Sequence, residues 1–194
     1  MNKGEIRKLI FKRLSELEQK AVSDRLIADR LLSNYGTMRA LSPTDETPRL
    51  SCPAGGTLNI FIYNSLPSEV DTKGIIEHLL YAGHNVYLPR INGKEMSLIA
   101  IDGDTEYIQN SYGIAEPVGE PYSGDVDICI VPLVAFDRGR VRLGRGGGFY
   151  DRFLHNSKAY KIAIAYSVQE YQAIPAEPHD IRMDIIVTER EIIV

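Results

Sequence analysis

The 194-residue sequence predicts an α/β protein, a three-layer α/β/α sandwich built on a mostly parallel sheet. Between residues 58 and 89, a strand pattern, a helix pattern and a second strand pattern follow one another, as in a βαβ unit with parallel strands. Residues 126–134 are apolar enough for a strand buried on both faces. Strand and helix patterns continue to alternate downstream, so we expect one domain over residues 1–194.

The composition is typical of a globular protein and argues against nucleic-acid-binding and membrane proteins. Hydrophobic residues make up 44% of the sequence and charged residues 25%, which is typical of a soluble globular chain. The net charge of −4 argues against a general nucleic-acid-binding protein. No stretch approaches the roughly 20 apolar residues of a membrane span, and the N-terminus lacks a signal-peptide pattern. We expect a cytoplasmic protein, a monomer, with no nucleic-acid or membrane partner.

The first elements are helical. Residues 3–34 place apolar side chains at three- and four-residue steps, which predicts helical structure. A break is expected near Ser15 or Ser23, because either serine can cap a new helix. Lys3 and Arg7 are four residues apart and would project together toward one anionic ligand.

Residues 37–56 contain three prolines and two glycines with little periodicity, which indicates a long, mobile surface loop. A strand over 58–63 then leads to a helix capped by Asp71 or Thr72. The other expected elements are strands at 85–89, 95–101 (antiparallel), 126–134, 161–166 and 184–188, helices near 149–156 and 168–172, and loop over most of 102–124.

The most distinctive stretch is residues 142–152, which hold four glycines and three arginines between a buried strand and a helix start. Glycines let backbone N–H groups approach an anion, a helix N-terminus favours negative charge, and arginine binds phosphate in bidentate fashion. This composition predicts a phosphate-binding loop. The alternative is a glycine-rich turn with solvated arginines.

Standard nucleotide motifs do not fit this loop. A dinucleotide fingerprint needs glycine where Phe149 stands, and a Walker loop needs lysine after Gly148. The four histidines share no metal-ligand spacing, and no serine or cysteine lies in a nucleophile elbow. Cys129, inside the strand pattern, is interpreted as a small core residue.

Carboxylates near such a loop matter, because ATP usually arrives with Mg²⁺, which prefers oxygen ligands. Asp151 ends the loop, and metal binding and helix capping are equally good interpretations of it. Asp180 and Asp184 precede the last strand and would reach the same sheet edge. Asp137 is expected to order the arginine-rich turn, and Glu69 is either functional or a first-turn acid.

These motifs together resemble the 5-formyltetrahydrofolate cyclo-ligase family, also called 5,10-methenyltetrahydrofolate synthetases. The resemblance is strongest over residues 131–154, and shorter matches in the same order cover nearly the whole chain. The shorter matches are Lys3 to Arg7, Glu69-Val-Asp71-Thr72, Val86-Tyr-Leu-Pro89, Gly113-Ile-Ala-Glu116-Pro117, His179-Asp180 and Thr188-Glu189.

The resemblance implies a C–N bond-forming ligase, with a fold similar to the NagB/RpiA/CoA-transferase-like fold. The implied reaction converts ATP and 5-formyltetrahydrofolate to 5,10-methenyltetrahydrofolate, ADP and phosphate with Mg²⁺, through phosphorylation of the formyl oxygen. A non-catalytic folate- or nucleotide-binding protein on the same scaffold and a small-molecule kinase with another acceptor are the alternatives. In the family, glycine usually stands where this chain has Arg140, so the conformation of that turn is open.

The resemblance also implies roles for individual residues, with Arg145 as the catalytic residue closest to the transferring phosphoryl group. The implied ATP-binding residues are Lys3, Gly4, Glu5, Ile6, Arg7, Arg142, Leu143, Gly144, Arg145, Gly146, Gly147, Gly148, Phe149 and Tyr150. The implied substrate-binding residues are Tyr63, Glu69, Arg145, Gly146, Gly147, Gly148 and Phe149, and the implied magnesium ligands are Asp151 and Asp180.

Overall fold

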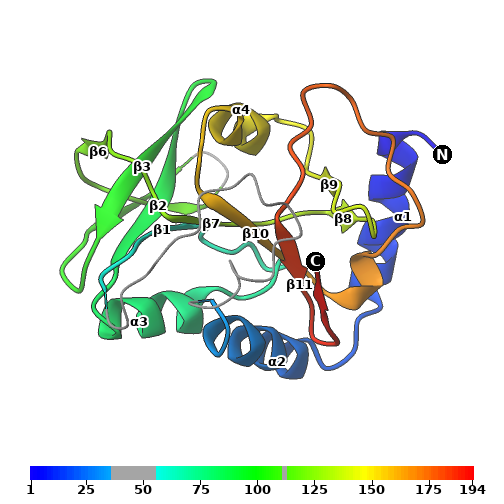
Figure 1. The fold of residues 1–194 in the computed structure, drawn as a ribbon, viewed down its shortest axis with the longest axis horizontal. Coiled ribbons are helices and arrows are strands. Elements are labelled where there is room, and N and C mark those ends of the chain that lie inside the picture. The colour runs from blue at the N-terminus through cyan, green and yellow to red at the C-terminus, as the bar shows by residue number, and fades with distance from the viewer. Residues whose placement is uncertain (36–55, 111–112) are drawn as a thin grey trace.

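The computed structural model describes residues 1–35, 56–110 and 113–194. Within them, eight strands form one sheet in the order β12-β11-β10-β7-β1-β2-β3-β6, with helices around it (Figure 1). The predicted mobile loop at 37–56 lies, apart from Gly56, outside the described residues. The helical elements are α1 (Lys3–Ser15), α2 (Lys20–Leu32), α3 (Lys73–Tyr81), α4 (Phe149–His155) and the 3-10 helix η2 (Ser167–Gln169). The strands are β1 (Asn59–Ile62), β2 (Asn85–Asn92), β3 (Glu95–Ile101), β4 (Tyr107–Gln109), β5 (Ala115–Pro117), β6 (Pro121–Tyr122), β7 (Ile128–Val131), β8 (Ala135–Phe136), β9 (Arg142–Leu143), β10 (Tyr160–Ile164), β11 (Ile185–Val187) and β12 (Ile192–Ile193).

The sheet is mostly parallel, as predicted. The central strands run parallel to one another in the order β11, β10, β7, β1 and β2. The strands β3, β6 and β12 pair antiparallel at the edges. Strand order reverses between β1 and β7, because the chain builds β2 on one side of β1 and then β7, β10 and β11 on the other. In such sheets ligands bind outside the carboxyl ends of the strands at this switch point.

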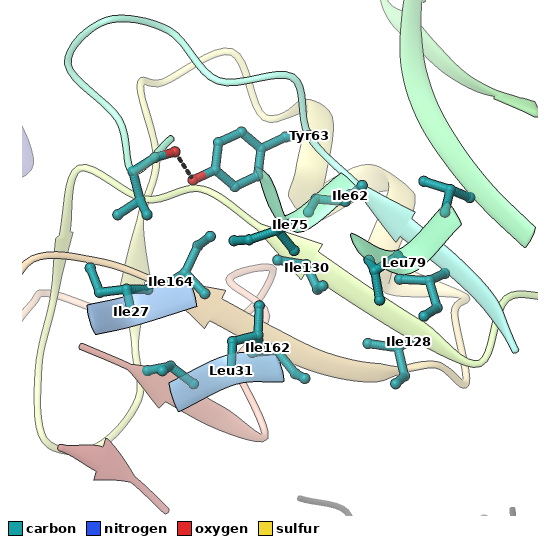
Figure 2. Packing of buried hydrophobic residues seen from close by; sticks show 14 of the residues in the cluster. Ile27, Leu31, Ile62, Tyr63, Ile75, Leu79, Ile128, Ile130, Ile162 and Ile164 are labelled. Carbon is teal, nitrogen blue, oxygen red and sulfur yellow. Dashed lines mark hydrogen bonds between the residues drawn. The ribbon is translucent and has the colours of Figure 1, made fainter. Parts of the chain in front are cut away.

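Helices cover both faces of the sheet, which gives the predicted α/β architecture. Side chains alternate along a strand, so Ile128 and Ile130 of β7 point to one face and Cys129 and Val131 to the other. Helices α2 and α3 cover the first face, and α4 covers the second (Figure 1). Figure 2 shows the first face, where Ile27 and Leu31 of α2 and Ile75 and Leu79 of α3 meet Ile62, Ile128, Ile130, Ile162 and Ile164 of the strands.

Helix α1 lies beside a short hairpin instead of the main sheet (Figure 1). Ile6 and Ile10 are fully buried against Val134, Val141 and Leu143 of the β8–β9 hairpin and its flanks. The hairpin corrects the expectation that the glycine loop directly follows the buried strand: β8 and β9 intervene. It therefore brings the N-terminal helix and the glycine loop together.

Several boundaries differ from the predicted ones. Ser15 ends α1 and Ser23 lies inside α2, so neither serine caps a helix; the chain turns at Gln19, whose left-handed φ of 55° starts α2 without a side-chain cap. Glu69 lies before α3 and is not a first-turn acid; Thr72 stands at the cap position, but its hydroxyl donates to the carbonyl of Tyr63. Most of the described part of 102–124 is loop, as expected, but the short strands β4, β5 and β6 form within it.

None of the helices in the described ranges has the length and apolar character needed to cross a membrane.

Arg140 occupies a backbone conformation that suits glycine. Its φ is 61°, in the left-handed region where a Cβ is strained. The turn is held by the Arg140 N–H, which donates to the carbonyl of Asp137 at 2.9 Å, and by the N–H of Met183, which donates to the Arg140 carbonyl at 3.1 Å. The Asp137 carboxylate orders this turn as predicted, accepting the N–H groups of Val141 and Ile174.

Arg140→Gly is therefore expected to raise the free energy of unfolding by about 1 kcal/mol, since it removes left-handed strain at a small cost in chain entropy. The Arg140 Nε, which is buried without a hydrogen-bond partner among the described residues, disappears as well. Urea denaturation measures the change. Arg25→Gly inside α2 is the matched control and should lower stability by about 1 kcal/mol; a loss of stability in Arg140→Gly would contradict the strain argument.

Candidate active site

A cavity of about 710 Å³ lies at the switch point of the sheet. Asn64 and Leu66 reach it from the end of β1, and Pro132 and Leu133 reach it from the end of β7. The glycine loop and the start of α1 complete its wall. The location matches the site that the strand order predicts for a ligand.

Arg7 connects the first helix to the glycine loop. Its Nε donates to the carbonyl of Gly144 at 2.8 Å, so the guanidinium lies against the loop backbone. Gly146 adopts φ +105°, and a Cβ built there would lie 3.6 Å from the Arg7 guanidinium. Gly148 also has a left-handed φ of 67°. Glycine is thus required for the path of the loop, and a cation faces the cavity beside it.

Arg142 is a buried cation at the base of the loop. Its side chain is 2% exposed, and its Nη2 donates to Asp151 Oδ1 at 2.6 Å. The guanidinium carbon lies 5.5 Å from the ring centre of Tyr150. Its Nε has no hydrogen-bond partner among the described residues. Asp151 does not cap the backbone of α4; it ties the helix to β9 through this ion pair.

Arg145 of the loop pairs with Glu69, which lies before α3. Arg145 Nε donates to Glu69 Oε1 at 3.1 Å, and its Nη2 donates to the hydroxyl of Ser68 at 2.9 Å. Glu69 Oε2 accepts the N–H of Leu66 at 2.9 Å. The Arg145 side chain is 44% exposed, whereas that of Glu69 is 10% exposed. Burial, together with the Glu69 charge, raises the pKa of the neighbouring Tyr150 well above its usual range.

Lys3 forms a second cationic contact, with the 177–180 segment. Its Nζ donates to Asp180 Oδ2 at 2.7 Å and to Glu177 Oε2 at 3.1 Å. Partial burial alone would lower the pKa of Lys3 and raise that of Asp180. The hydrogen bonds outweigh it, so the Lys3 pKa is raised and the Asp180 pKa is lowered.

The carboxylates at the cavity suit a divalent cation. Glu177, His179 and Asp180 present ligand atoms that all lie within 4.8 Å of one another. Asp151 lines the same cavity but does not belong to this group in the described part of the chain. Asp151 and Asp180 each engage one carboxylate oxygen with a cationic side chain. A hard cation such as Mg²⁺ takes one or two carboxylates together with phosphate oxygens, so these donors fit it.

The other end of the cavity is mainly apolar. Ile91 and Met96 come from β2 and β3, and Ile114 lies just before β5. Glu116 of β5 is a carboxylate within this apolar wall. The lining of this end consists of Asn64, Leu66, Pro89, Ile91, Met96, Asn110, Ile114, Ala115, Glu116 and Phe149.

The structure brings most of the predicted site residues to one cavity. Their binding roles stay predictions, because no ligand is present. Those that line it are Lys3, Arg7, Glu69, Arg142, Leu143, Gly144, Arg145, Gly146, Gly147, Gly148, Phe149, Tyr150, Asp151 and Asp180.

Four predicted residues do not line the cavity. Tyr63 is 1% exposed and lies in the core, where its hydroxyl donates to the carbonyl of Val70 (Figure 2). This corrects the expectation that it lines a pocket. Ile6 is buried against the β8–β9 hairpin, Glu5 forms a capping box with Asn2, and Gly4 lies next to that cap.

Sequence reasoning missed several lining residues. Ile91, Met96 and Glu116 come from strands far from the glycine loop in the chain, and only the sheet order brings them to it. Glu177 and His155 were also missed. Asn64, which lies just beyond a strand at the edge where ligands bind, and Glu116, which belongs to a motif of the resemblance, were the available indications.

Comparison with known proteins identifies the family of this chain. The model of the 5-formyltetrahydrofolate cyclo-ligase family matches residues 55–189. The Haemophilus influenzae 5-formyltetrahydrofolate cyclo-ligase is 37% identical in an alignment 140 positions long that covers 66% of this chain and 75% of that protein. The Escherichia coli K12 protein of the same name is 36% identical in an alignment 140 positions long that covers 66% of this chain and 76% of that protein.

Solved structures give the same assignment. The NMR structure of Aquifex aeolicus 5,10-methenyltetrahydrofolate synthetase superposes with a TM-score of 0.78 at 29% identity, covering 99% of this chain and 92% of that one. A Mycoplasma pneumoniae 5,10-methenyltetrahydrofolate synthetase, 23% identical, shares the fold with a TM-score of 0.68, covering 97% of this chain and 99% of that one. The further likeness to the NagB/RpiA/CoA-transferase-like fold stays a prediction. The chain belongs to the 5-formyltetrahydrofolate cyclo-ligase family.

Proposed function

We propose that this protein converts ATP and 5-formyltetrahydrofolate to 5,10-methenyltetrahydrofolate, ADP and phosphate. One observation carries the proposal: a single cavity joins a glycine loop flanked by cations to an apolar pocket that contains carboxylates. The cationic end suits a triphosphate, and the apolar end suits a flat, partly polar ring system. A carrier that binds only one of these ligands would not need both ends in one cavity.

The first step transfers a phosphoryl group. The formyl oxygen attacks the γ-phosphorus, the bond from phosphorus to the ADP oxygen breaks, and an imidate-like phosphate forms. Little covalent chemistry is required of the protein, so its task is to align the reactants and neutralise charge. Arg145 belongs to the glycine loop, and Arg7 donates to the carbonyl of Gly144 in it. These two arginines are the cations proposed to face the transferring group.

The second step closes the ring. The nitrogen at position 10 attacks the formyl carbon and loses its proton, and the carbon–oxygen bond breaks as phosphate leaves with that oxygen. An unactivated amide oxygen is a poor leaving group, which is why phosphorylation must come first. Glu69 lies near Arg145 and is proposed to hydrogen-bond the pterin ring, so that the folate is held beside the loop.

Asp151 and Asp180 are the residues proposed to hold Mg²⁺, which when bound supplies charge neutralisation for the phosphates. Both carboxylates line the cavity, and each is already paired with a cationic side chain. Lys3 and Arg142 thereby balance these carboxylates in the ligand-free protein.

Incubation with ATP, Mg²⁺ and 5-formyltetrahydrofolate should produce the absorbance band of the methenyl product together with one ADP per turnover. Reactions without ATP, or with a non-hydrolysable ATP analogue, serve as controls and should show no band. Tight folate binding without ADP release would point instead to a non-catalytic binding protein. ADP release with other acceptors but not with this folate would indicate a small-molecule kinase.

A further inference from the structure

Glu116 is a carboxylate of the cavity to which the mechanism above gives no role. It lies in β5 and lines the apolar end of the cavity. Its Oε1 accepts the backbone N–H of Ile91 at 3.1 Å and the side-chain Nδ2 of Asn110 at 2.9 Å. Two donors on one oxygen fix the orientation of the carboxylate. Its Oε2 accepts no hydrogen bond from the described residues, so one charged oxygen is available.

Glu69, the carboxylate of the cavity that pairs with Arg145, differs in this respect. Glu69 Oε1 accepts from Arg145 and its Oε2 accepts from Leu66, so both oxygens already have protein partners. A ligand that offers N–H donors would compete with Arg145 at Glu69 but meet a free acceptor at Glu116. The segment that carries Glu116 is also anchored, since Asn64 Nδ2 donates to the carbonyl of Ala115 at 3.0 Å.

We propose that Glu116 determines specificity at the apolar end, its Oε2 accepting an N–H from the aminopyrimidinone edge of the folate. The proposal deepens the proposed function and rests on it for the identity of the ligand. That ring edge presents two adjacent donors, the ring N–H and the exocyclic amino group. A partly buried carboxylate oxygen is a strong acceptor for such donors.

Charge and shape favour the folate over the nucleotide at this position. Phosphates belong beside the arginines of the glycine loop, and a carboxylate would repel them. The adenine edge places a ring acceptor next to its amino group, and the lone pair of that acceptor meets unfavourable charge from Glu116. Ile91 and Ile114 line the same cavity as Glu116, so a flat ring can bury apolar surface while its edge reaches Oε2.

Glu116→Gln tests the proposal by changing essentially one atom. Because Ile91 and Asn110 are both donors, the glutamine oxygen must take the Oε1 position and its NH₂ must replace Oε2. The Kd for 5-formyltetrahydrofolate, measured by calorimetry without ATP, should rise about 10- to 100-fold, the range for losing a charged hydrogen bond. The KM for that folate should rise in parallel, and the KM for ATP should stay within twofold.

A second measurement changes the ligand and not the protein. The analogue of 5-formyltetrahydrofolate with methyl in place of the 2-amino group should bind the wild-type protein about 10-fold more weakly or worse. The Glu116→Gln variant should bind this analogue with nearly the same affinity as the wild-type protein does, because the two changes remove the same interaction. Glu120→Gln, a change at an exposed position shortly after β5, is the matched control. It should leave the affinity for both the folate and the analogue unchanged.

The outcomes separate the possible failures. Unchanged folate affinity in Glu116→Gln together with undiminished analogue binding would overturn the role of Glu116, and so would a selective rise in the KM for ATP. Absence of ATP-dependent turnover in the wild-type protein would overturn the proposed function, while the calorimetric arm would still decide whether Glu116 binds the ring edge.

Discussion

Arg145→Ala is expected to lower kcat by at least about 100-fold, while the free energy of unfolding changes by no more than about 0.5 kcal/mol. Removal of a guanidinium from a transferring phosphoryl group typically costs two to five powers of ten in rate. The fold should tolerate the change, because the Arg145 side chain is 44% exposed and Glu69 keeps the hydrogen bond from the N–H of Leu66. Stopped assays of ADP release and urea denaturation measure the two effects.

Arg138→Ala is the matched control for this experiment. Arg138 lies in the same arginine-rich segment but pairs with Glu170 and Glu191 and does not line the cavity. Its loss should leave kcat within about twofold. Arg145→Lys keeps the charge without the planar fork and should recover only part of the rate. If Arg145→Ala retained activity close to wild type, the phosphoryl-stabilising role would be wrong.

The parallel core could be predicted because the residue types of its strands indicate that they are buried on both faces. The alternation of Ile128, Cys129, Ile130 and Val131 shows a strand that is apolar on both faces, and such strands belong in the middle of a parallel sheet. The βαβ order then predicts that β1 and β2 lie parallel and are joined by a right-handed crossover. Nothing beyond local pattern was needed for these elements.

The hairpin of β8 and β9 could not be predicted in this way. Each strand has only two residues, too few for a period, and its stability comes from Ile6 and Ile10 of a helix more than a hundred residues away. The left-handed turn at Arg140 was equally hidden, since the residue type there argues against the conformation that it adopts.

The candidate site likewise has one part that local sequence predicts and another that depends on the tertiary fold. The position of the glycine loop at the cavity could be expected, since glycines and arginines together favour an anion site. The apolar end was not, because Ile91 and Glu116 meet the loop only through the order of the strands. Tyr63 shows the converse error: it follows a strand at the ligand-binding edge, yet its ring turns into the core.

Asp151→Ala is expected to lower the free energy of unfolding by about 3 kcal/mol, in addition to abolishing any metal role. The reason lies in Arg142, whose side chain is 2% exposed and whose guanidinium donates to Asp151 at 2.6 Å. Without the carboxylate, a buried cation loses its counterion, and its Nε already lacks a hydrogen-bond partner in the described part of the structure. Denaturation in urea gives the size of the loss.

A double variant shows whether the loss of stability in Asp151→Ala comes from the unpaired charge of Arg142. Arg142→Met combined with Asp151→Leu should restore most of the lost stability while the protein stays inactive, since apolar pairs of similar volume replace buried ion pairs well. Asp29→Ala, which removes an exposed partner of Arg25 at 4.0 Å, should change stability by less than about 0.5 kcal/mol. A loss of similar size in the double variant and in Asp151→Ala would show that Asp151 stabilises the fold by some means other than neutralising Arg142. The expected rescue would instead mean that Asp151 holds the base of the loop together by neutralising Arg142.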